Sequence, residues 1–168
     1  IRHTYDYDGE GRRVRHQLQT STGNGPWAVS ATTTFVYDAF GRLAAEYGST
    51  PTTLCTTCYI TTDPLGSTRL ITDENGSAKS RSDFLPFGEE IPADRTNRPT
   101  VPCGTSSCFG QATGITQKFT TKERDAETGL DNFLARYYSG AQGRFTSPDL
   151  PLLDQDASDP QSWNLYSY

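Results

Sequence analysis

Short stretches that alternate between apolar and polar residues, or that are rich in β-branched residues, recur along the whole chain. Alternation with a period of two is typical of a strand with one buried face, and Thr, Val, Ile and Tyr favour extended backbone. The longest apolar runs span only a few residues, as at residues 150–153. The pattern predicts short strands at residues 32–37, 42–47, 58–62, 68–72 and 132–138.

A six-residue motif, Tyr-Asp-x-x-Gly-Arg, occurs at residues 7–12 and again at residues 37–42. Asp can accept a hydrogen bond from the backbone N–H two residues on, and Gly takes the positive φ that closes a tight turn without a Cβ clash. Shorter echoes follow at residues 63–66, 73–76, 86–89 and 140–145. We interpret each motif as the corner of one hairpin, with these turn residues: Asp8, Gly11, Asp38, Gly41, Asp63, Gly66, Asp73 and Gly76.

Repeated corners of this kind predict an all-β fold of stacked β-hairpins with little helix. Stacking would place each Tyr ring of the motif against the next repeat, and each Arg near a carboxylate or a ring. Such a sheet grows by contacts between neighbours, so no single repeat is stable alone. Because only 33% of the 168 residues are apolar, the core is thin, and we expect support from neighbouring repeats or a partner chain.

Two regions depart from the hairpin pattern. Residues 122–136 begin with charged helix formers, but Gly129 argues against a long helix. We expect a turn at residues 125–129, with strands at residues 119–122 and 132–138 on either side. Residues 92–117, which contain three prolines and three glycines up to Ile115, are interpreted as a long surface loop.

Composition and charge exclude some classes of function. The net charge is −5 and the 15 basic residues are scattered, so no cationic stripe exists to neutralise a nucleic-acid backbone. No apolar run approaches the roughly 20 residues that a membrane-spanning helix needs. The sequence has no Met and begins without the regions of a signal peptide, so we expect a fragment or a processed product of a longer exported chain.

Four cysteines fall in two close pairs, Cys55 with Cys58 and Cys103 with Cys108, in sequence rich in Thr, Ser, Pro and Gly. An even number of cysteines in local pairs favours disulfides and an oxidising compartment. A zinc site is the alternative, because a two-residue gap also suits a metal-binding knuckle. The second pair has a four-residue gap and no His close in sequence, so we favour two local disulfides over zinc.

Several strings occur in an order that resembles a known family. They are DPLGSTR at residues 63–69, LPFGE at 85–89, KERDAETGL at 122–130, ARYY at 135–138, GRFTSPD at 143–149 and NLYSY at 164–168. Together with the Tyr-Asp motifs, they resemble the YD repeats of RHS proteins and the RHS-associated core that follows them. The two Cys pairs are not part of that family pattern.

The resemblance implies a cocoon of spiralling β-strands that encloses a variable C-terminal polypeptide, often a toxin, with the core closing one end. It divides the chain into YD repeats at residues 1–54, repeat-to-core hairpins at 55–91, the loop at 92–117 and the RHS-associated core at 118–168. The neighbours implied are upstream YD repeats of the same parent chain, and either an enclosed polypeptide or further copies of this chain.

Asp149 is a weak catalytic candidate. In self-processing members of the family the core resembles an aspartyl autoprotease, in which two carboxylates share a proton and activate water. Asp149 matches the first of the two Asp strings, although Leu150 and Pro151 replace the expected residues, and the second string would follow residue 168. We therefore interpret Asp149 as a turn residue, and we expect no enzymatic activity from this chain.

Other polar groups favour structural interpretations. His3 and His16 flank the first repeat and are interpreted as exposed strand residues, because no nucleophile can be identified beside them. Residues 89–90 and 154–159 offer oxygen ligands for calcium, but the acidic run lacks the Gly and the final Glu of an EF-hand loop. Residues 75–77 fit the glycosylation pattern, although a turn explains them without sugar. We predict no metal site and no cofactor.

The function that these observations favour is structural: part of a secreted or surface-displayed β-shell around a C-terminal polypeptide. One alternative is a self-processing aspartyl protease segment that acts once on its own chain. The other is an extracellular fibre or adhesion module that assembles through exposed strand edges.

Overall fold

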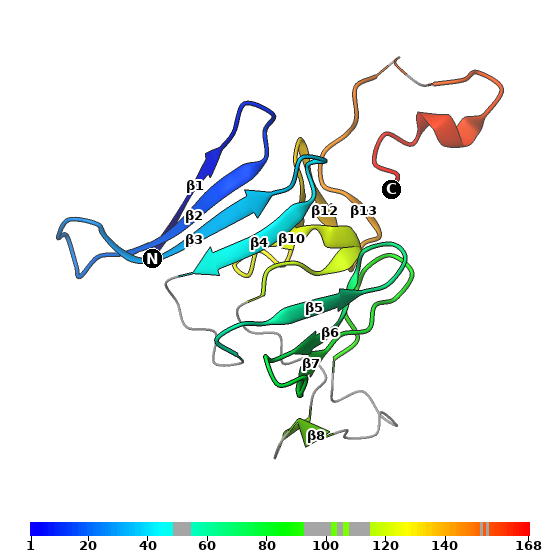
Figure 1. The fold of residues 1–168 in the computed structure, drawn as a ribbon. Helices are drawn as coiled ribbons and strands as arrows, with labels where there is room; N and C mark the ends of the chain where they lie inside the picture. The colour runs from blue at the N-terminus through cyan, green and yellow to red at the C-terminus, as the bar shows by residue number, and fades with distance from the viewer. Residues whose placement is uncertain (49–54, 93–101, 104–105, 108–114, 152, 154) are drawn as a thin grey trace. The chain divides into compact units, whose positions relative to one another are not determined.

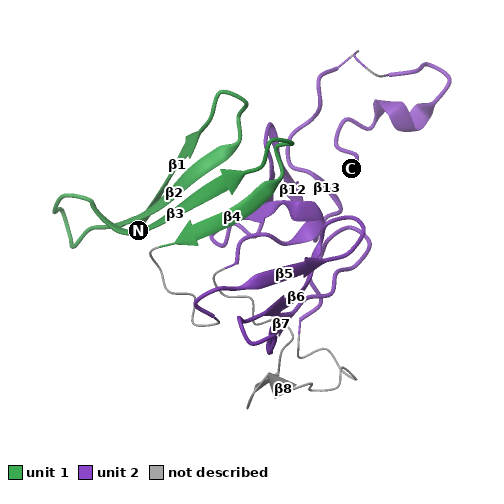
Figure 2. Cartoon of the chain, in the orientation of Figure 1, with its two compact units in different colours: residues 1–53 green, residues 54–168 purple. Residues whose placement is uncertain are grey.

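The computed structural model describes residues 1–48, 55–92, 102–103, 106–107, 115–151, 153 and 155–168 (Figure 1). The chain divides into two compact units, Ile1–Thr53 and Leu54–Tyr168 (Figure 2), and each unit is described by itself. Throughout the described ranges the sheets are antiparallel, with two short 3-10 turns and no α-helix. The predicted all-β fold is confirmed.

The first unit is a four-stranded sheet in which each strand pairs with the next along the chain. One face carries the buried side chains of Arg13, Ala31 and Phe35, and the other is rich in Thr and Gln, so one side of the sheet is polar. The strands are β1 (Arg2–Tyr7), β2 (Arg13–Thr20), β3 (Ala28–Tyr37) and β4 (Leu43–Gly48).

The second unit contains a three-stranded and a four-stranded sheet, and a pair of two-residue strands. The three-stranded sheet consists of β5 (Tyr59–Thr62), β6 (Thr68–Thr72) and β7 (Ala78–Arg81). The four-stranded sheet consists of β10 (Glu123–Arg124), β11 (Asp131–Phe133), β12 (Arg136–Ser139) and β13 (Arg144–Phe145). The short pair is β8 (Pro102–Cys103) with β9 (Ser106–Ser107), and the 3-10 turns are Phe119–Thr121 and Pro160–Trp163.

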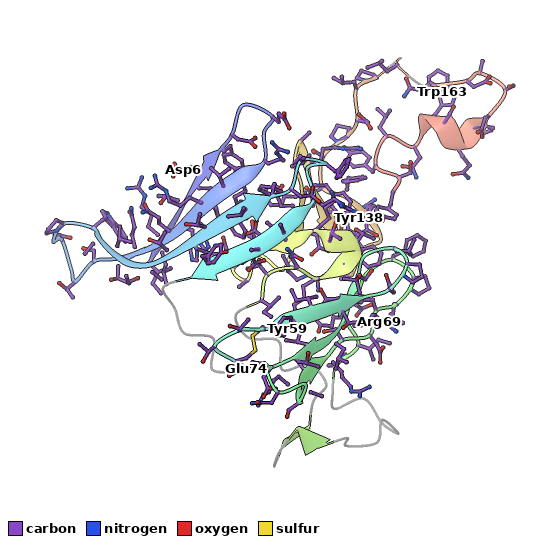
Figure 3. The ribbon with its side chains drawn as sticks, in the orientation of Figure 1. Asp6, Tyr59, Arg69, Glu74, Tyr138 and Trp163 are labelled. Carbon is purple, nitrogen blue, oxygen red and sulfur yellow. A yellow bond between two sulfur atoms is a disulfide. The ribbon has the colours of Figure 1, made fainter. Side chains whose placement is uncertain are left out.

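An aromatic cluster forms the core of the second unit. Phe119, Tyr138 and Phe145 are buried, and Phe84 and Phe133 pack against them. Tyr138, which Figure 3 labels, is fully buried, and its hydroxyl donates to the Phe87 carbonyl at 2.8 Å. Burial raises the pKa of Tyr138 to about 12, so this phenol stays a neutral donor at physiological pH.

The ring of Tyr168 joins this aromatic cluster from the end of the described chain. Its centroid lies 4.8 Å from that of Tyr138 and 5.8 to 6.3 Å from those of Phe119, Phe133 and Phe145. Offset and edge-to-face contacts at such distances are favourable for aromatic rings. A backbone hydrogen bond adds to this contact: the N–H of Phe145 donates to the Tyr166 carbonyl at 3.0 Å. Residues 165–168 are thereby docked on the four-stranded sheet.

Four of the predicted strands are confirmed. Residues 32–37 lie within β3, residues 68–72 form β6, and residues 42–47 and 58–62 match β4 and β5 to within one residue. Short local patterns were sufficient here because each strand is bounded by a tight turn that the sequence also marks.

The strand predicted at residues 119–122 is wrong. Phe119–Thr121 is a 3-10 turn in which Thr120 and Thr121 have positive φ values of 47° and 61°. Contacts with a distant corner explain this: the N–H of Thr121 donates to the Gly66 carbonyl, and that of Thr120 to the Ser67 hydroxyl. Tertiary hydrogen bonds therefore override the local preference of Thr for extended backbone.

The strand predicted at residues 132–138 is wrong in its continuity. Two strands, β11 and β12, are separated by a turn at Leu134, whose φ is +66°. The N–H of Leu134 donates to the side-chain oxygen of Asn132 at 2.9 Å. This is the hydrogen bond of an Asx-turn, in which the Asn side chain mimics a backbone turn. The turn predicted at residues 125–129 is present, since the N–H of Gly129 donates to the Asp125 carbonyl.

Only part of the long loop predicted at residues 92–117 can be compared. Strands β8 and β9 pair within it, and Ile115 is buried. Residues 93–101, 104–105 and 108–114 lie outside the described residues.

Candidate functional site

Each predicted corner of the first two repeats closes with the same hydrogen bonds. In the first, Asp8 Oδ1 accepts from the N–H groups of Glu10 and Arg12 at 2.9 and 2.8 Å. The N–H of Gly11 donates to the Asp8 carbonyl at 3.1 Å, and Gly11 has a φ of +77°. The ladder shifts register just before Asp8, as expected for a turn that ends in a bulge with a left-handed glycine.

The same geometry recurs at the other three corners. The carboxylates of Asp38, Asp63 and Asp73 accept from the N–H groups two and four residues on, at 2.9 to 3.0 Å. Gly41, Gly66 and Gly76 have φ values from +74° to +86°. All eight turn residues named from the sequence therefore belong to the same type of turn, which occurs four times in the described residues.

Cations hold three of these carboxylates in the ionised form. The Arg12 side chain donates to Asp8 Oδ2 at 2.7 Å, and hydrogen bonds from Arg12 hold the pKa of Asp8 below its usual value. Backbone and side-chain bonds from Arg42 do the same for Asp38. At the fourth corner the ammonium of Lys79, 2.9 Å away, lowers the pKa of Asp73. These groups cap turns and are poor candidates for proton transfer.

The two corners of the first unit also touch each other. The Tyr37 hydroxyl donates to the Arg13 carbonyl at 2.9 Å, and the Arg12 guanidinium lies 5.3 Å from the centre of the Tyr37 ring. A Cβ on Gly41 would lie 3.1 Å from Arg12 Nη1, so the second corner closes tightly on the first. The Tyr and Arg of the motif therefore link one hairpin to the next.

Cys55 and Cys58 form a disulfide with their Cα atoms 5.5 Å apart, just before β5; Figure 3 draws it as a yellow bond beside Tyr59. These two sulfurs are thus not zinc ligands. The second predicted bridge, between Cys103 and Cys108, cannot be compared, because Cys108 lies outside the described residues. In the described part of the chain no three His, Cys, Asp or Glu side chains are grouped as metal ligands.

A guanidinium, rather than a second carboxylate, holds Asp149. Arg136 Nη2 lies 2.8 Å from Asp149 Oδ2, and the N–H of Leu150 donates to Asp149 Oδ1. The backbone N–H of Asp149 and the Arg136 side chain both donate to the Leu165 carbonyl, at 2.8 and 3.4 Å. The ion pair thereby ties the end of the described chain to the sheet. An aspartyl pair would instead need two carboxylates that share one proton.

A buried charge cluster in the second unit was missed by sequence reasoning. Asp131 is fully buried and takes two hydrogen bonds of 2.8 Å from the Arg124 guanidinium. Arg124 also donates to the Gly88 carbonyl at 3.1 Å. Lys118 and Glu90 complete the cluster, with 3.4 Å between Nζ and Oε2, and Arg124 Nη1 lies 3.7 Å from the same Oε2.

Burial and ion pairing have opposite effects on the pKa values of the charged groups in this cluster. Desolvation raises the pKa of Asp131, and the bonds from Arg124 oppose that rise. Desolvation lowers the pKa of Lys118, against the attraction of Glu90. For Arg124, desolvation is outweighed by the hydrogen bonds that it donates to Asp131 together with the charges of Asp131 and Glu90, so its pKa is raised and it remains charged. Mutual neutralisation, with Ser82 donating to Glu90 at 2.9 Å, makes the cluster a structural tie between the Gly88 loop and β11.

Three of the described carboxylates considered for calcium are engaged in other contacts. Glu90 belongs to the charge cluster, and Asp156 accepts both the N–H and the hydroxyl of Ser158 at 2.8 and 2.7 Å. Asp159 caps the 3-10 turn Pro160–Trp163 by accepting the N–H of Gln161. Asn75 lies in the exposed fourth corner, where its N–H donates to Asp73.

The histidines are not exposed strand residues, so that prediction is wrong. His3 and His16 are half-buried, and His3 Nδ1 lies 2.9 Å from His16 Nε2. They share the face of the sheet that also buries Arg13, which explains the loss of exposure. Their spacing of thirteen residues carries no recognisable signal unless the hairpin register is already known.

Comparison with known proteins supports the fold. No protein-family model and no curated protein sequence matches the chain. The crystal structure of TcdB2-TccC3 without its hypervariable C-terminal region aligns over 98% of this chain and 8% of that chain, with 21% identity and a TM-score of 0.57. The crystal structure of TcdB2-TccC3-Cdc42 aligns with the same identity, coverage and TM-score.

The chain spans only 8% of the length of these proteins, and at 21% identity the likeness concerns the fold. None of the helical segments in the described residues has the length and apolar character of a membrane span. Nearly the whole chain therefore has the fold of a short part of much larger proteins.

Proposed function

We propose that the chain is a structural segment of a larger RHS-repeat β-shell, secreted or displayed at a cell surface. The observation that carries the proposal is the Asp-x-x-Gly turn, which is repeated four times with the same hydrogen bonds of Asp and Gly. The fold that contains these turns aligns over 98% of the chain with a small part of a larger protein. Repeats of this kind gain stability from their neighbours, so a shell gives each hairpin the support that it lacks alone.

The disulfide supports an oxidising compartment for this segment. Cys55 and Cys58 are joined, and such bonds persist mainly in secreted and surface proteins. The neighbours proposed are upstream YD repeats of the same parent chain. What the shell would enclose is a C-terminal polypeptide, in keeping with the hypervariable C-terminal region of TcdB2-TccC3, which the similar structure leaves out.

The proposal is tested on the native protein. An antibody raised against the 168-residue chain should detect a much larger polypeptide in the secreted or surface fraction. In that parent chain, the region after residue 168 should resist added protease until the shell is unfolded with denaturant. A native species no larger than the chain itself, or a following region that is cut at once, would contradict the shell.

The proposed role includes no catalysis by this segment. The ion pair between Arg136 and Asp149 supports this, because it commits the carboxylate to a guanidinium that also donates to the Leu165 carbonyl. Purified chain incubated between pH 4 and pH 8 should stay intact by mass spectrometry. Time-dependent cleavage that the substitution Asp149→Asn abolishes would instead make the chain a self-processing protease segment.

A further inference from the structure

Tyr7 and Tyr37 hold the same position in the two hairpins of the first unit. Each lies one residue before the Asp of its corner and pairs across the hairpin with the residue that follows the Arg of the motif. The ladder shifts register just before each of them. The two side chains therefore start from equivalent backbone positions, and differences between their surroundings reflect what lies beside each hairpin.

The preceding corner fills the space around Tyr37. The Tyr37 hydroxyl donates to the Arg13 carbonyl at 2.9 Å, and the Arg12 guanidinium lies 5.3 Å from the centre of the ring. The same guanidinium covers Gly41, where an added Cβ would lie 3.1 Å from Arg12 Nη1. A hydrogen bond, a cation–π contact and a close packing contact thus join the later corner to the earlier one.

The equivalent contacts are open at Tyr7. In the described part of the chain the Tyr7 hydroxyl makes no hydrogen bond, and the side chain is 49% exposed. The cation near its ring is Arg13 of its own hairpin, at 5.9 Å. A Cβ on Gly11 would meet nothing within 4 Å. Among the described strands β1 pairs only with β2, so the open contacts lie at its outer edge, as those of Tyr37 lie on the β2 side of β3.

We propose that the outer edge of β1 binds a hairpin of the Tyr-Asp-x-x-Gly-Arg type from an upstream repeat of the parent chain, with Tyr7 as the anchor. The proposal rests on the proposed shell, and it names the neighbour and the contact at one edge. The Tyr7 hydroxyl donates to the carbonyl of the residue after the Arg of that hairpin, and that Arg covers Tyr7 and Gly11. The contact has a direction, because the Tyr belongs to the later hairpin and the Arg to the earlier one.

The spacing of the motif defines a chain that tests this contact. The motif recurs after thirty residues, at residues 7–12 and 37–42. A copy of residues 1–30 placed ahead of Ile1 therefore sets an added corner at the same distance before Tyr7 as the first corner has before Tyr37. The faces of the sheet also stay in register, since Tyr5 and Phe35 both lie two residues before the motif Tyr.

The experiment compares the 168-residue chain with this tandem chain by hydrogen exchange, at concentrations where both are monomeric. We expect the outward amides of β1 to exchange roughly tenfold or more slowly in the tandem chain, because the added hairpin pairs with them. Tyr7→Phe removes only the hydroxyl. It should speed the exchange of these amides by roughly two- to tenfold in the tandem chain and leave the 168-residue chain unchanged.

The tandem chain offers a matched control. The same substitution of Tyr by Phe at the motif tyrosine of the added copy, which has no hairpin before it, should leave the exchange of β1 unchanged. Tyr37→Phe is the positive control, since its hydrogen bond to the Arg13 carbonyl is present in both chains. It should speed the exchange of β3 amides in both chains alike.

The proposal is overturned if the outward amides of β1 exchange equally fast in the two chains, since a motif hairpin at the correct spacing then does not bind there. It is also overturned if Tyr7→Phe has the same effect in both, because the hydroxyl is then not the anchor. Protection of β1 in the 168-residue chain that rises with its concentration would overturn it too, and would identify a second copy of the chain as the occupant. The shell itself is decided separately, by the protease resistance of the region after residue 168 in the parent chain.

Discussion

The positive-φ glycines of this chain differ in what lies beside them. Gly76 at the fourth corner has a φ of +77° and open space where a Cβ would be. Gly88 has a φ of +85°, and a Cβ there would lie 2.5 Å from the Phe119 ring. Gly140 packs as closely, since its Cβ would meet the Gly88 carbonyl carbon and oxygen at 2.7 Å. The Gly88 loop is thus wedged between the aromatic core and the turn after β12.

Gly88→Ala should cost much more stability than Gly76→Ala. At Gly76 only the left-handed backbone is strained, which costs roughly 1–2 kcal/mol for a residue with a Cβ. At Gly88 the clash with Phe119 adds the cost of overpacking, typically a further 1–3 kcal/mol. Urea unfolding of both variants measures the difference. Equal losses would show that the loop moves away from Phe119 without cost.

Arg124→Met should be strongly destabilising because it leaves a buried carboxylate unpaired. Asp131 is fully buried, and removal of one partner of a buried ion pair typically costs about 3–5 kcal/mol. The double variant Arg124→Met with Asp131→Leu should recover most of that loss, since the buried carboxylate is removed together with its partner while Lys118 and Glu90 still pair with each other. Chemical denaturation at pH 7 decides; a double variant as unstable as the single one would contradict the argument.

The corner carboxylates make an acid-labile contribution to stability. The pKa values of Asp8, Asp38 and Asp73 are lowered in the folded chain. A lowered folded pKa stabilises the fold above the unfolded pKa of about 3.9, and this stabilisation is lost as the pH falls through the folded value. The unfolding temperature should therefore fall as the pH is lowered from about 5 to about 2.

Replacement of these three residues by Asn tests the origin of that fall. An Asn side chain still accepts the backbone bonds of the turn but does not titrate. The triple variant should be less stable than the unsubstituted chain at pH 7, and its unfolding temperature should depend less on pH between about 2 and 5. If the pH dependence of the unfolding temperature is unchanged in the triple variant, other titrating groups cause the acid sensitivity.

At the scale of the secondary-structure element, the sequence predicted the features whose determining residues lie close together along the chain. The four corners were readable because Asp, Gly and their hydrogen bonds lie within five residues of each other. Thr120 was not, because its positive φ accompanies a hydrogen bond from its N–H to Ser67, far away in the sequence. The turn at Leu134 was missed although its N–H donates to the side chain of Asn132 only two residues away, because Leu does not favour a positive φ and so gives no signal for a turn.

Distance along the chain explains the other misses. The buried charge cluster draws its four members from the segment before β8, from the region around Phe119 and from β10 and β11. Nothing local distinguishes Asp131 from a surface carboxylate. The approach of His3 to His16 likewise depends on the hairpin register. The Asp149 candidate depended on a family resemblance, and its contact with Arg136 required the fold.

The Cys55–Cys58 bond belongs to the entry into β5. Closing so short a loop should stabilise the chain by only about 1–3 kcal/mol. The variant Cys55→Ser with Cys58→Ser should therefore remain folded, with a loss of that size in urea unfolding and faster proteolysis next to β5. Unfolding of the variant at 25 °C would show that the bond is required for folding of the unit.

At the scale of the whole molecule, the first unit leaves two strand edges open. In the described part of the chain β1 pairs only with β2, and β4 only with β3. Several large apolar side chains of this unit are also exposed, with Trp27 at 48%, Val29 at 52% and Tyr47 at 65%. An isolated sheet with unpaired edges and exposed aromatic residues invites further strands. In a shell, neighbouring repeats would supply them.

Hydrogen exchange measures whether those edges are paired in the native protein. In the isolated chain the outward amides of β1 and β4 should exchange orders of magnitude faster than those of β2 and β3, which are bonded on both sides. If the chain is a segment of a shell, the same amides in the intact parent should be protected to the level of β2 and β3, because neighbouring hairpins pair with them. Protection of β4 that is equally weak in both samples would mean that no strand is added there. Weak protection of β2 and β3 as well would mean that the unit does not fold outside the parent chain.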